Sequence, residues 1–239
     1  MEYIWDYLNE KTYNTKVGLY KYKREYKFII NNAINDFTNV LDIAGGSGRF
    51  ALPLFEYSKK ITVLDINQSA LDLLRERNCE IDIICSDFIQ FQIQDTYSLL
   101  LCIEAIEYFE DWEVFFDKVN KVLLHDGLFI FTYANPNSWR YYLRKIKHWK
   151  NVPTHYNEMS ISNLIKTLYK SNLEVDKIEG MNWIPLPLSS NSILVTFFAI
   201  IENIFKLKNW HSQSPWLLIA VKKRKHINDN NADSLTITQ

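Results

Sequence analysis

The sequence predicts an α/β fold, a three-layer sandwich in which helices cover both faces of a mostly parallel sheet. Two observations lead to this prediction. Over residues 40–55 an apolar run rich in β-branched residues passes into a glycine loop and then into a helical pattern, which is the order strand, turn, helix. Further strand and helix patterns then alternate along the chain, as is typical of a parallel sheet.

The composition is that of an ordinary globular protein with one or two domains. The 239 residues are 47% hydrophobic and contain 27 Lys+Arg against 28 Asp+Glu. The net charge of -1 gives no general attraction to nucleic acid or to an anionic membrane, so any such contact would need a local patch. Cys79, Cys85 and Cys102 are odd in number and lack metal-ligand spacing. We therefore expect reduced thiols, no metal site and a cytoplasmic protein.

No signal peptide or membrane span is expected. The first residues lack a basic region followed by an apolar one. The longest apolar stretch, 193–201, is far shorter than the ~20 residues that a transmembrane helix needs.

Residues 1–38 are predicted to form a helical N-terminal cap. Aromatic and charged residues alternate here, and 20–34 has the apolar spacing of a helix that packs on the sheet edge. The aromatic side chains have two interpretations. They pack in the core, where they bury large areas, or Trp5 or Tyr13 closes as a lid over cofactor and substrate.

The glycine loop at 44–48 is the first candidate for a ligand site. Glycine lets the backbone approach a ligand closely, and the free amides of the turn and the following helix face that ligand. The pattern Gly46-x-Gly48-x-x-Ala51 also satisfies the fingerprint for a dinucleotide pyrophosphate. Asp42, at the end of the preceding strand, opposes a pyrophosphate dianion and favours a cofactor that carries positive charge.

The remaining elements of this half follow the βαβ order, and each strand ends in polar residues on the side where ligands bind in open α/β sheets. In chain order we expect a strand at 61–65, a helix at 67–77, strands at 80–85 and 97–103, a helix at 114–124, a turn at 125–127 and a strand at 128–133. Asp65 ends the second strand, where a carboxylate accepts hydrogen bonds from a ribose diol. Asp87 follows the third strand and either accepts from an adenine amine, with Phe88 covering the ring, or caps a turn.

The motifs between 40 and 134 together resemble those of class I S-adenosylmethionine (SAM) methyltransferases in order and spacing. They are 42–48, Asp65, 86–88, 101–111 and 123–133. The resemblance implies a seven-stranded Rossmann-like sheet with an antiparallel last strand. It also implies SAM as cofactor, S-adenosylhomocysteine (SAH) as product, and methyl transfer to an oxygen or nitrogen of a small-molecule or sugar-like biosynthetic intermediate.

The resemblance also implies roles for individual residues. Asp42 and the loop would hold the methionine portion of SAM, Asp65 the ribose, Asp87 and Phe88 the adenine, and Ile103 with Glu104 the sulfonium side. The full expected cofactor set is Asp42, Ala44, Gly45, Gly46, Gly48, Asp65, Ile66, Asp87, Phe88, Ile103 and Glu104.

Two positions depart from the family pattern. Ala44 stands where the family usually has its first glycine, so we expect the backbone to adopt φ < 0 there or to move outward, with weaker SAM binding. Tyr108 replaces a histidine that is common after the fourth strand. Tyr108 is nevertheless a candidate general base, after His155.

Residues 139–150 are predicted to form a helix with one aromatic and one basic face. The helix is either solvated or binds a phosphorylated or acidic substrate through Arg140 and Arg144. Asn135, just before the helix, and Tyr13 complete the expected substrate contacts. His155 follows in a loop, as a surface residue or as a general base with a suitable pKa.

The last part of the chain is expected to complete the sheet. A helix at 159–169, strands at 172–179 and 216–221, and an apolar helix at 193–205 are predicted, the apolar helix as a lid or dimer surface. We therefore divide the chain into a cap (1–38), a methyltransferase domain (39–222) with insertions at 139–170 and 185–212, and a polar tail (223–239).

Three other functions fit parts of the pattern. An RNA methyltransferase could use the 139–150 helix, but the nearly neutral chain has no added RNA-binding domain. A non-catalytic SAM-binding protein is suggested only by Ala44. A dinucleotide oxidoreductase fits the fingerprint alone. We expect a small-molecule substrate and no nucleic-acid partner, and the sequence allows a homodimer.

Overall fold

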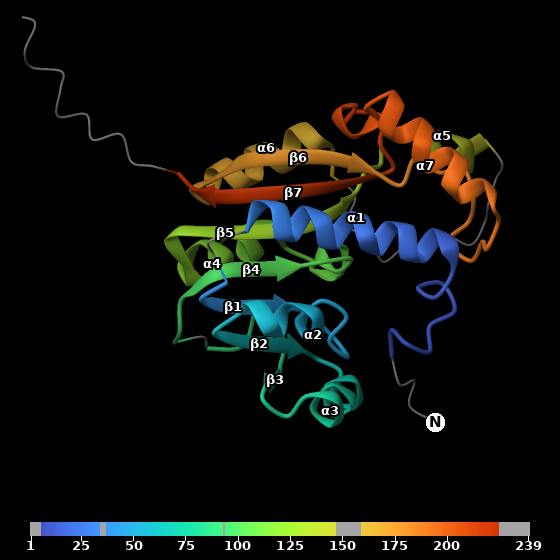
Figure 1. Ribbon diagram of the computed structural model, residues 1–239. Helices are drawn as coiled ribbons and strands as arrows, with labels where there is room; N and C mark the ends of the chain where they lie inside the picture. Colours follow the sequence, from blue (N-terminus) through green and yellow to red (C-terminus); the bar gives the residue numbers. More distant parts are fainter. Residues whose placement is uncertain (1–5, 34–36, 93, 147–158, 225–239) are drawn as a thin grey trace, which may run out of the picture.

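The computed structural model describes residues 6–33, 37–92, 94–146 and 159–224. Its centre is a seven-stranded sheet with the order β3-β2-β1-β4-β5-β7-β6, flanked by helices on both faces (Figure 1). β7 is antiparallel to both of its neighbours, and the remaining pairs are parallel. The expected fold class, including the antiparallel last strand, is confirmed.

The elements lie close to the ranges expected from the sequence. The strands are β1 Asn39–Ile43, β2 Lys60–Asp65, β3 Asp82–Cys85, β4 Tyr97–Cys102, β5 Leu123–Ala134, β6 Leu173–Met181 and β7 Trp216–Lys223. The α-helices are α1 Lys16–Asn32, α2 Ala51–Leu54, α3 Gln68–Arg77, α4 Trp112–Val122, α5 Trp139–Ile146, α6 Ile161–Lys170 and α7 Leu194–Ile204. Short 3-10 helices are η1 Phe55–Tyr57, η2 Ile106–Tyr108 and η3 Leu207–Asn209. None of the helices in the described ranges has the length and hydropathy needed to cross a bilayer.

The turn expected at 125–127 lies inside β5 instead. The pairing of β4 with β5 jumps from Tyr97 opposite Leu123 to Leu99 opposite Leu128. The residues between Leu123 and Leu128 therefore bulge out of the ladder, which is how a strand absorbs extra residues without ending.

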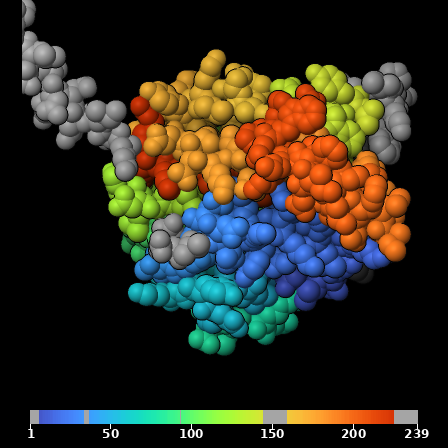
Figure 2. All heavy atoms as spheres, turned by 45° about the horizontal axis from the view of Figure 1, so that its top comes forward, coloured from blue at the N-terminus to red at the C-terminus, as the bar shows by residue number. Residues whose placement is uncertain are grey.

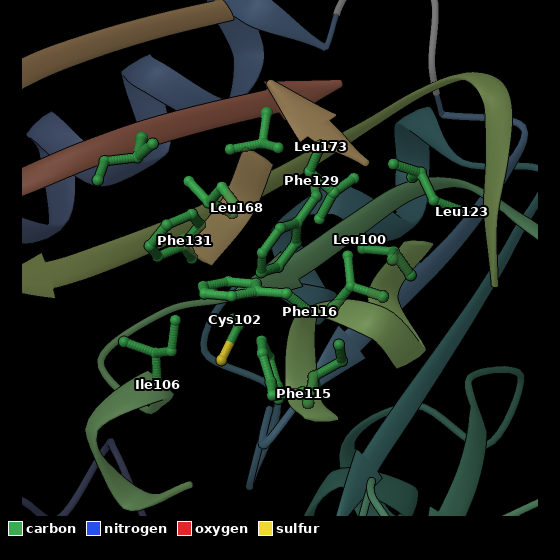
Figure 3. Packing of buried hydrophobic residues seen from close by; sticks show 14 of the residues in the cluster. Leu100, Cys102, Ile106, Phe115, Phe116, Leu123, Phe129, Phe131, Leu168 and Leu173 are labelled. Atoms are coloured by element: carbon green, nitrogen blue, oxygen red, sulfur yellow. The ribbon is translucent and has the colours of Figure 1, made fainter. Parts of the chain in front are cut away.

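Hydrophobic side chains fill both faces of the sheet because alternate strand residues point to opposite sides. Leu41 packs with the α4 side of the sheet, and its neighbour Val40 packs with the other side. The first of these clusters is rich in aromatic rings from α4 and β5, shown in Figure 3. Phe88 belongs to it: the side chain is 1% exposed and its ring lies 5.3 Å from that of Phe115. The expectation that Phe88 covers the adenine ring is therefore wrong, because the ring is inside the core.

The parallel strands end together at one edge of the sheet. β1 pairs with β2 on one side and with β4 on the other. The arrows of these strands point to the same edge, beside which the start of α1 and the helices α5 and α7 lie (Figure 1). The candidate site residues at the strand ends are thereby brought together.

Asn135 connects β5 to the loop before β7. Its side chain is buried, and its Nδ2 donates to the carbonyl oxygens of His211, Ser212 and Ser214 at 3.2, 3.1 and 2.9 Å. Its Oδ1 accepts from the Asn137 amide at 3.0 Å. Its donors and its acceptor are thus engaged within the protein, so the expected substrate contact is corrected to a structural tether.

Arg140, in α5, also ties two distant segments of the chain together. Its Nη2 donates to the carbonyl oxygens of Ile184 and, at 3.4 Å, Leu186. The guanidinium therefore holds the 184–186 loop through Nη2, and the substrate contact expected from the sequence stays a prediction.

Ala44 adopts a left-handed conformation with φ of 57°. The expectation of φ < 0 or an outward shift is wrong, because the amide of Ala44 stays hydrogen-bonded to the Leu64 carbonyl at 2.7 Å. The turn keeps the backbone of a glycine-containing loop and accepts the steric cost of a Cβ, about 1 to 2 kcal/mol for a non-glycine residue.

Ala44→Gly should raise the free energy of unfolding by about 0.5 to 1 kcal/mol. Glycine removes the left-handed penalty of about 1 to 2 kcal/mol, and only about 0.4 to 1 kcal/mol is lost to the more flexible unfolded chain. Urea unfolding monitored by circular dichroism measures the difference. Ala51→Gly, in α2, is the matched control and should destabilise the protein; a loss of the same size for Ala44→Gly would contradict this account of the turn.

Candidate cofactor and substrate site

Asp65 is fixed beside the glycine turn at the end of β2. Its Oδ2 accepts from the Gly46 amide and its Oδ1 from the Asn67 amide, both at 2.8 Å. A carboxylate has about four lone-pair positions, so two of them remain for a ligand. The adjacent Ile66 side chain is 75% exposed. The end of β2 therefore presents an oriented acceptor next to an exposed apolar side chain.

Asp42 lies beneath the same turn. A Cβ on Gly45 would come within 2.7 Å of the Asp42 Cγ and Oδ2 atoms, so only glycine fits above this carboxyl group. Asp42 Oδ2 is buried and has no hydrogen-bond partner within the described ranges. Burial, and then the nearby Asp65 charge, raises the pKa of Asp42 to about 7. A buried acceptor without a partner suits a positively charged ligand group.

Asp87 caps a turn after β3. Its Oδ1 accepts from the amides of Ile89 and Gln90 at 2.6 and 3.3 Å. The turn-cap interpretation is therefore confirmed, and an additional contact with adenine stays a prediction. Ile103, expected on the sulfonium side, is 8% exposed at the end of β4.

A buried ion network joins the glycine turn, the end of β4 and α1. Arg49 Nη1 lies 2.6 Å from Glu104 Oε1, and Arg49 Nη2 lies 3.3 Å from Glu25 Oε2. Lys21 Nζ lies 2.7 Å from Glu104 Oε2 and 3.5 Å from Glu25 Oε1. The side chains of Lys21 and Glu25 are 1% and 0% exposed. Two cations and two carboxyl groups are thus in direct contact where α1 meets the glycine turn and the end of β4.

The pKa values of the two carboxyl groups in the network are shifted in opposite directions. Burial raises the pKa of Glu104, but Lys21 and Arg49 outweigh it and hold that pKa well below its usual range. Burial, followed by repulsion from Glu104, raises the pKa of Glu25 despite the same two cations. Glu104 also has φ of 58°, and its amide donates to Thr132 Oγ1 at 2.6 Å. Glu104 is therefore the ionised carboxylate on which the two cations converge.

Residues 6–14 run over the glycine turn and are attached at both ends. Asp6 forms two hydrogen bonds of 2.8 Å with Arg77 Nη2 and accepts from Ser47 Oγ at 3.3 Å. At the other end the Tyr13 ring lies 4.1 Å from the Arg49 guanidinium, and its hydroxyl donates to Glu104 Oε2 at 3.4 Å. The structure thus brings Tyr13 to the site, as its expected substrate role requires.

The two candidate bases differ in what the structure says of them. Tyr108 is 64% exposed at the end of η2. The pKa of Tyr13 is raised, mainly by burial and to a small extent by Tyr108. His155, like Trp5, lies outside the described residues. Arg144 is in α5, but its side chain is outside what the structure describes.

Sequence reasoning missed the ion network and the Asp6–Arg77 pair. Lys21 and Glu25 have the i,i+4 spacing of a helical ion pair, a signal that ordinarily indicates a solvated face. Arg49 was part of the glycine motif but had no assigned role. Only the tertiary structure reveals that these charges are buried together.

Comparisons with known proteins identify the family and the fold. A family model described as a methyltransferase domain matches residues 13–178. The ubiquinone biosynthesis O-methyltransferase of Rickettsia bellii is 23% identical over 193 residues, which are 72% of this chain and 79% of that protein.

Two solved structures show the same fold. The magnesium protoporphyrin IX methyltransferase from Synechocystis, with bound SAH, has a TM-score of 0.63 at 10% identity and covers 94% of this chain and 90% of that one. The N-methyltransferase NodS from Bradyrhizobium japonicum, in complex with SAH, has a TM-score of 0.59 at 15% identity and covers 89% and 90%. The family match and the fold together confirm a SAM-dependent class I methyltransferase: the chain belongs to the methyltransferase-domain family.

Proposed function

We propose that this enzyme transfers the methyl group of SAM to an oxygen or nitrogen of a small-molecule or sugar-like biosynthetic intermediate. Support for the acceptor class comes from the names of the relatives, which are an O-methyltransferase of ubiquinone biosynthesis and an N-methyltransferase. The observation that carries the cofactor site is the pair of carboxylates at the glycine turn: Asp65, fixed by two amides, and Asp42, buried without a partner in the described ranges.

The residues at the turn fit SAM in charge and in hydrogen-bonding capacity. Asp65 retains lone pairs for the ribose hydroxyls, and Asp87 keeps a second carboxylate oxygen for the adenine amine. Asp42 provides a buried carboxyl group below the turn, and the cationic methionine portion would lie there and favour its charged form. The exposed Ile66 would contact the adenosine beside Asp65.

SAM supplies an electrophilic methyl group when bound, so the main task of the protein is to align the acceptor with it. Such positioning can lower the barrier by roughly 7 to 11 kcal/mol. The Tyr13 hydroxyl donates to Glu104, and the exposed Tyr108 follows Glu104 by four residues, so we assign both tyrosines to the acceptor side of the site. Residues 6–14, held by Arg77 and Arg49, would exclude water from it. Tyr108 and His155 remain the candidates for a base that removes the acceptor proton.

Asp65→Ala should weaken SAM binding by about 1.5 to 3 kcal/mol, because hydrogen bonds to a charged group are lost. Asp72→Ala, which removes an exposed carboxylate from the next helix, should leave the affinity unchanged. Titration calorimetry with SAM, SAH and NAD on the parent and both variants measures this, and NAD should not bind.

The acceptor class is tested in the same preparations with methyl-labelled SAM. A catechol, an amino sugar and total RNA are offered as acceptors, and label should enter one of the two small molecules in the parent and much less in Asp65→Ala. Transfer to RNA alone would contradict the proposed substrate class, and tighter binding of NAD than of SAM would contradict the cofactor site itself.

Asp42 gives a prediction about pH. Its pKa is raised from 3.8 to about 7 in the folded protein, so the native state binds this proton more tightly than the unfolded chain does. The contribution of Asp42 to the free energy of unfolding is therefore fully present at low pH and is lost as the pH rises toward about 7. At 1.36 kcal/mol per pKa unit, the loss is at most about 4 kcal/mol.

Urea unfolding of the cofactor-free protein at pH 5 and pH 8 checks this expectation. The free energy of unfolding should fall less between the two pH values in Asp42→Asn than in the parent, because asparagine has no proton to lose. Parallel pH profiles for parent and variant would show that Asp42 is not the buried proton-binding group inferred here.

A further inference from the structure

The outer face of α7 is apolar and exposed to solvent. Six large side chains on or next to this helix are between 48% and 79% exposed: Ile193, Leu194, Phe197, Ile200, Ile204 and Phe205. We call these six residues the α7 patch. Their spacing of three and four residues places them along one side of the helix.

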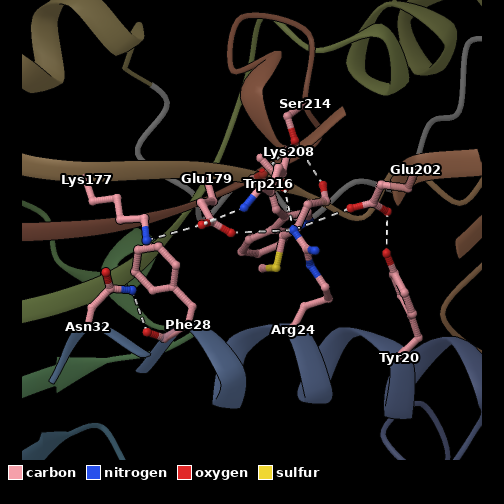
Figure 4. A network of polar contacts seen from close by, with 12 residues as sticks. Tyr20, Arg24, Phe28, Asn32, Lys177, Glu179, Glu202, Lys208, Ser214 and Trp216 are labelled. Carbon is pink, nitrogen blue, oxygen red and sulfur yellow. Dashed lines mark hydrogen bonds and ion pairs between the residues drawn. The ribbon is translucent and has the colours of Figure 1, made fainter. Parts of the chain in front are cut away.

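The inner face of α7 is firmly attached to the protein. Val195 is buried, and Glu202, which is 1% exposed, accepts from the Tyr20 hydroxyl and lies 3.6 Å from Arg24 Nη2 (Figure 4). Glu202 is the one charged residue in 182–205. Because it points inward, the α7 patch carries no charge, and its exposure is not the result of a loosely held helix.

The surroundings of the patch are aromatic and basic. Figure 2 shows α5, in yellow-green, beside α7, in orange, on the same side of the molecule. α5 exposes Tyr142 and Leu143, at 56% and 47%, and Trp210 after α7 is 56% exposed. α5 and residues 182–212 together contain five basic residues and one acid, Glu202; the basic residues are Arg140, Arg144, Lys145, Lys206 and Lys208. Arg140 donates to the Ile184 carbonyl and Lys208 lies 3.3 Å from Glu179, whereas Lys206, directly after the patch, makes no ion pair within the described residues.

Two occupants compete for such a surface, a second copy of the chain and a lipid surface. α7 has 11 residues and is therefore about 16 Å long. A pair of helices of this length is too small to bury the ~1,200 to 2,000 Å² typical of a stable interface, and two copies would bring their basic residues together. An uncharged helix face of Ile, Leu and Phe, bordered by Trp and Lys, has the composition of a helix that lies in a membrane interface.

We propose that the α7 patch docks this protein on the surface of an anionic phospholipid membrane. The apolar side chains enter the boundary between headgroups and acyl chains, while Lys206 contacts the lipid phosphates. α5 and α7 lie at the edge of the sheet to which the carboxyl ends of the parallel strands point (Figure 1). Docking by this patch would therefore hold the candidate site close to the lipid surface.

Co-sedimentation with vesicles tests the proposal. The full chain should bind vesicles of phosphatidylglycerol and phosphatidylcholine, and binding should weaken in pure phosphatidylcholine or in high salt. Phe197→Ser with Ile200→Ser should reduce the vesicle partition coefficient at least tenfold, as expected when buried apolar side chains are removed. Lys206→Glu should reduce it in anionic vesicles only.

The controls separate docking from folding and from dimer formation. Ile165→Ser changes a 43% exposed side chain on α6 and should bind vesicles like the parent. All variants should bind SAM with the parent affinity, which shows that they are folded. The vesicle test uses no methyl acceptor, so its result does not depend on the acceptor class. If the parent fails to bind anionic vesicles, or if light scattering shows a dimer that Phe197→Ser with Ile200→Ser converts to a monomer, the membrane proposal is overturned.

Discussion

The buried ion network of Lys21, Glu25, Arg49 and Glu104 is the constraint on which the rest of the site depends. It joins three parts that are distant in the sequence: α1, the glycine turn and the end of β4. Removing one member would leave a buried charge without its partner, which typically costs about 3 to 5 kcal/mol. The network therefore holds α1 in one position over the edge of the sheet.

This arrangement relates the cofactor side of the site to the acceptor side. Arg49 follows directly after the turn that carries Gly45 and Gly46, and its guanidinium also supports the Tyr13 ring. Glu104 forms ion pairs with Lys21 and Arg49 and accepts a hydrogen bond from the Tyr13 hydroxyl. A change in the glycine turn would thus reach residues 6–14 through direct contacts.

The sheet could be predicted from the sequence because its signals are local. Apolar strands, helix patterns and polar strand ends repeat in order from 40 to 134, and β1, β2 and β4 lie within a few residues of their expected ranges. Asp65 lies at the end of β2, beside the turn, because its position follows from that order. The position of Asp42 at the end of β1 follows from the same order of elements. Its burial beneath Gly45 and its raised pKa depend on the tertiary structure.

The misinterpreted residues all depend on contacts between distant segments. Phe88 was expected on the pocket surface, but Phe109 and the α4 residue Phe115 pack against its ring. Asn135 was expected to face the substrate, but its partners are carbonyl groups more than seventy residues away. Ala44 adopts a conformation that its residue type disfavours, because β1 and the hydrogen bond from its amide to the Leu64 carbonyl of β2 fix the start of the turn. Propensity and spacing describe local preference, and tertiary contacts overrule it at these positions.

A double-mutant cycle with Lys21→Met and Glu104→Gln tests the role of the ion network most directly. The free energy of unfolding is measured for the parent, both single variants and the double variant. If the two groups act as one buried pair, each single change should be strongly destabilising, and the double variant should lose less than the sum of the two by about 1 to 3 kcal/mol. Single losses that add within about 0.5 kcal/mol would show that Lys21 and Glu104 act independently, and would contradict the network as the link between α1 and the site.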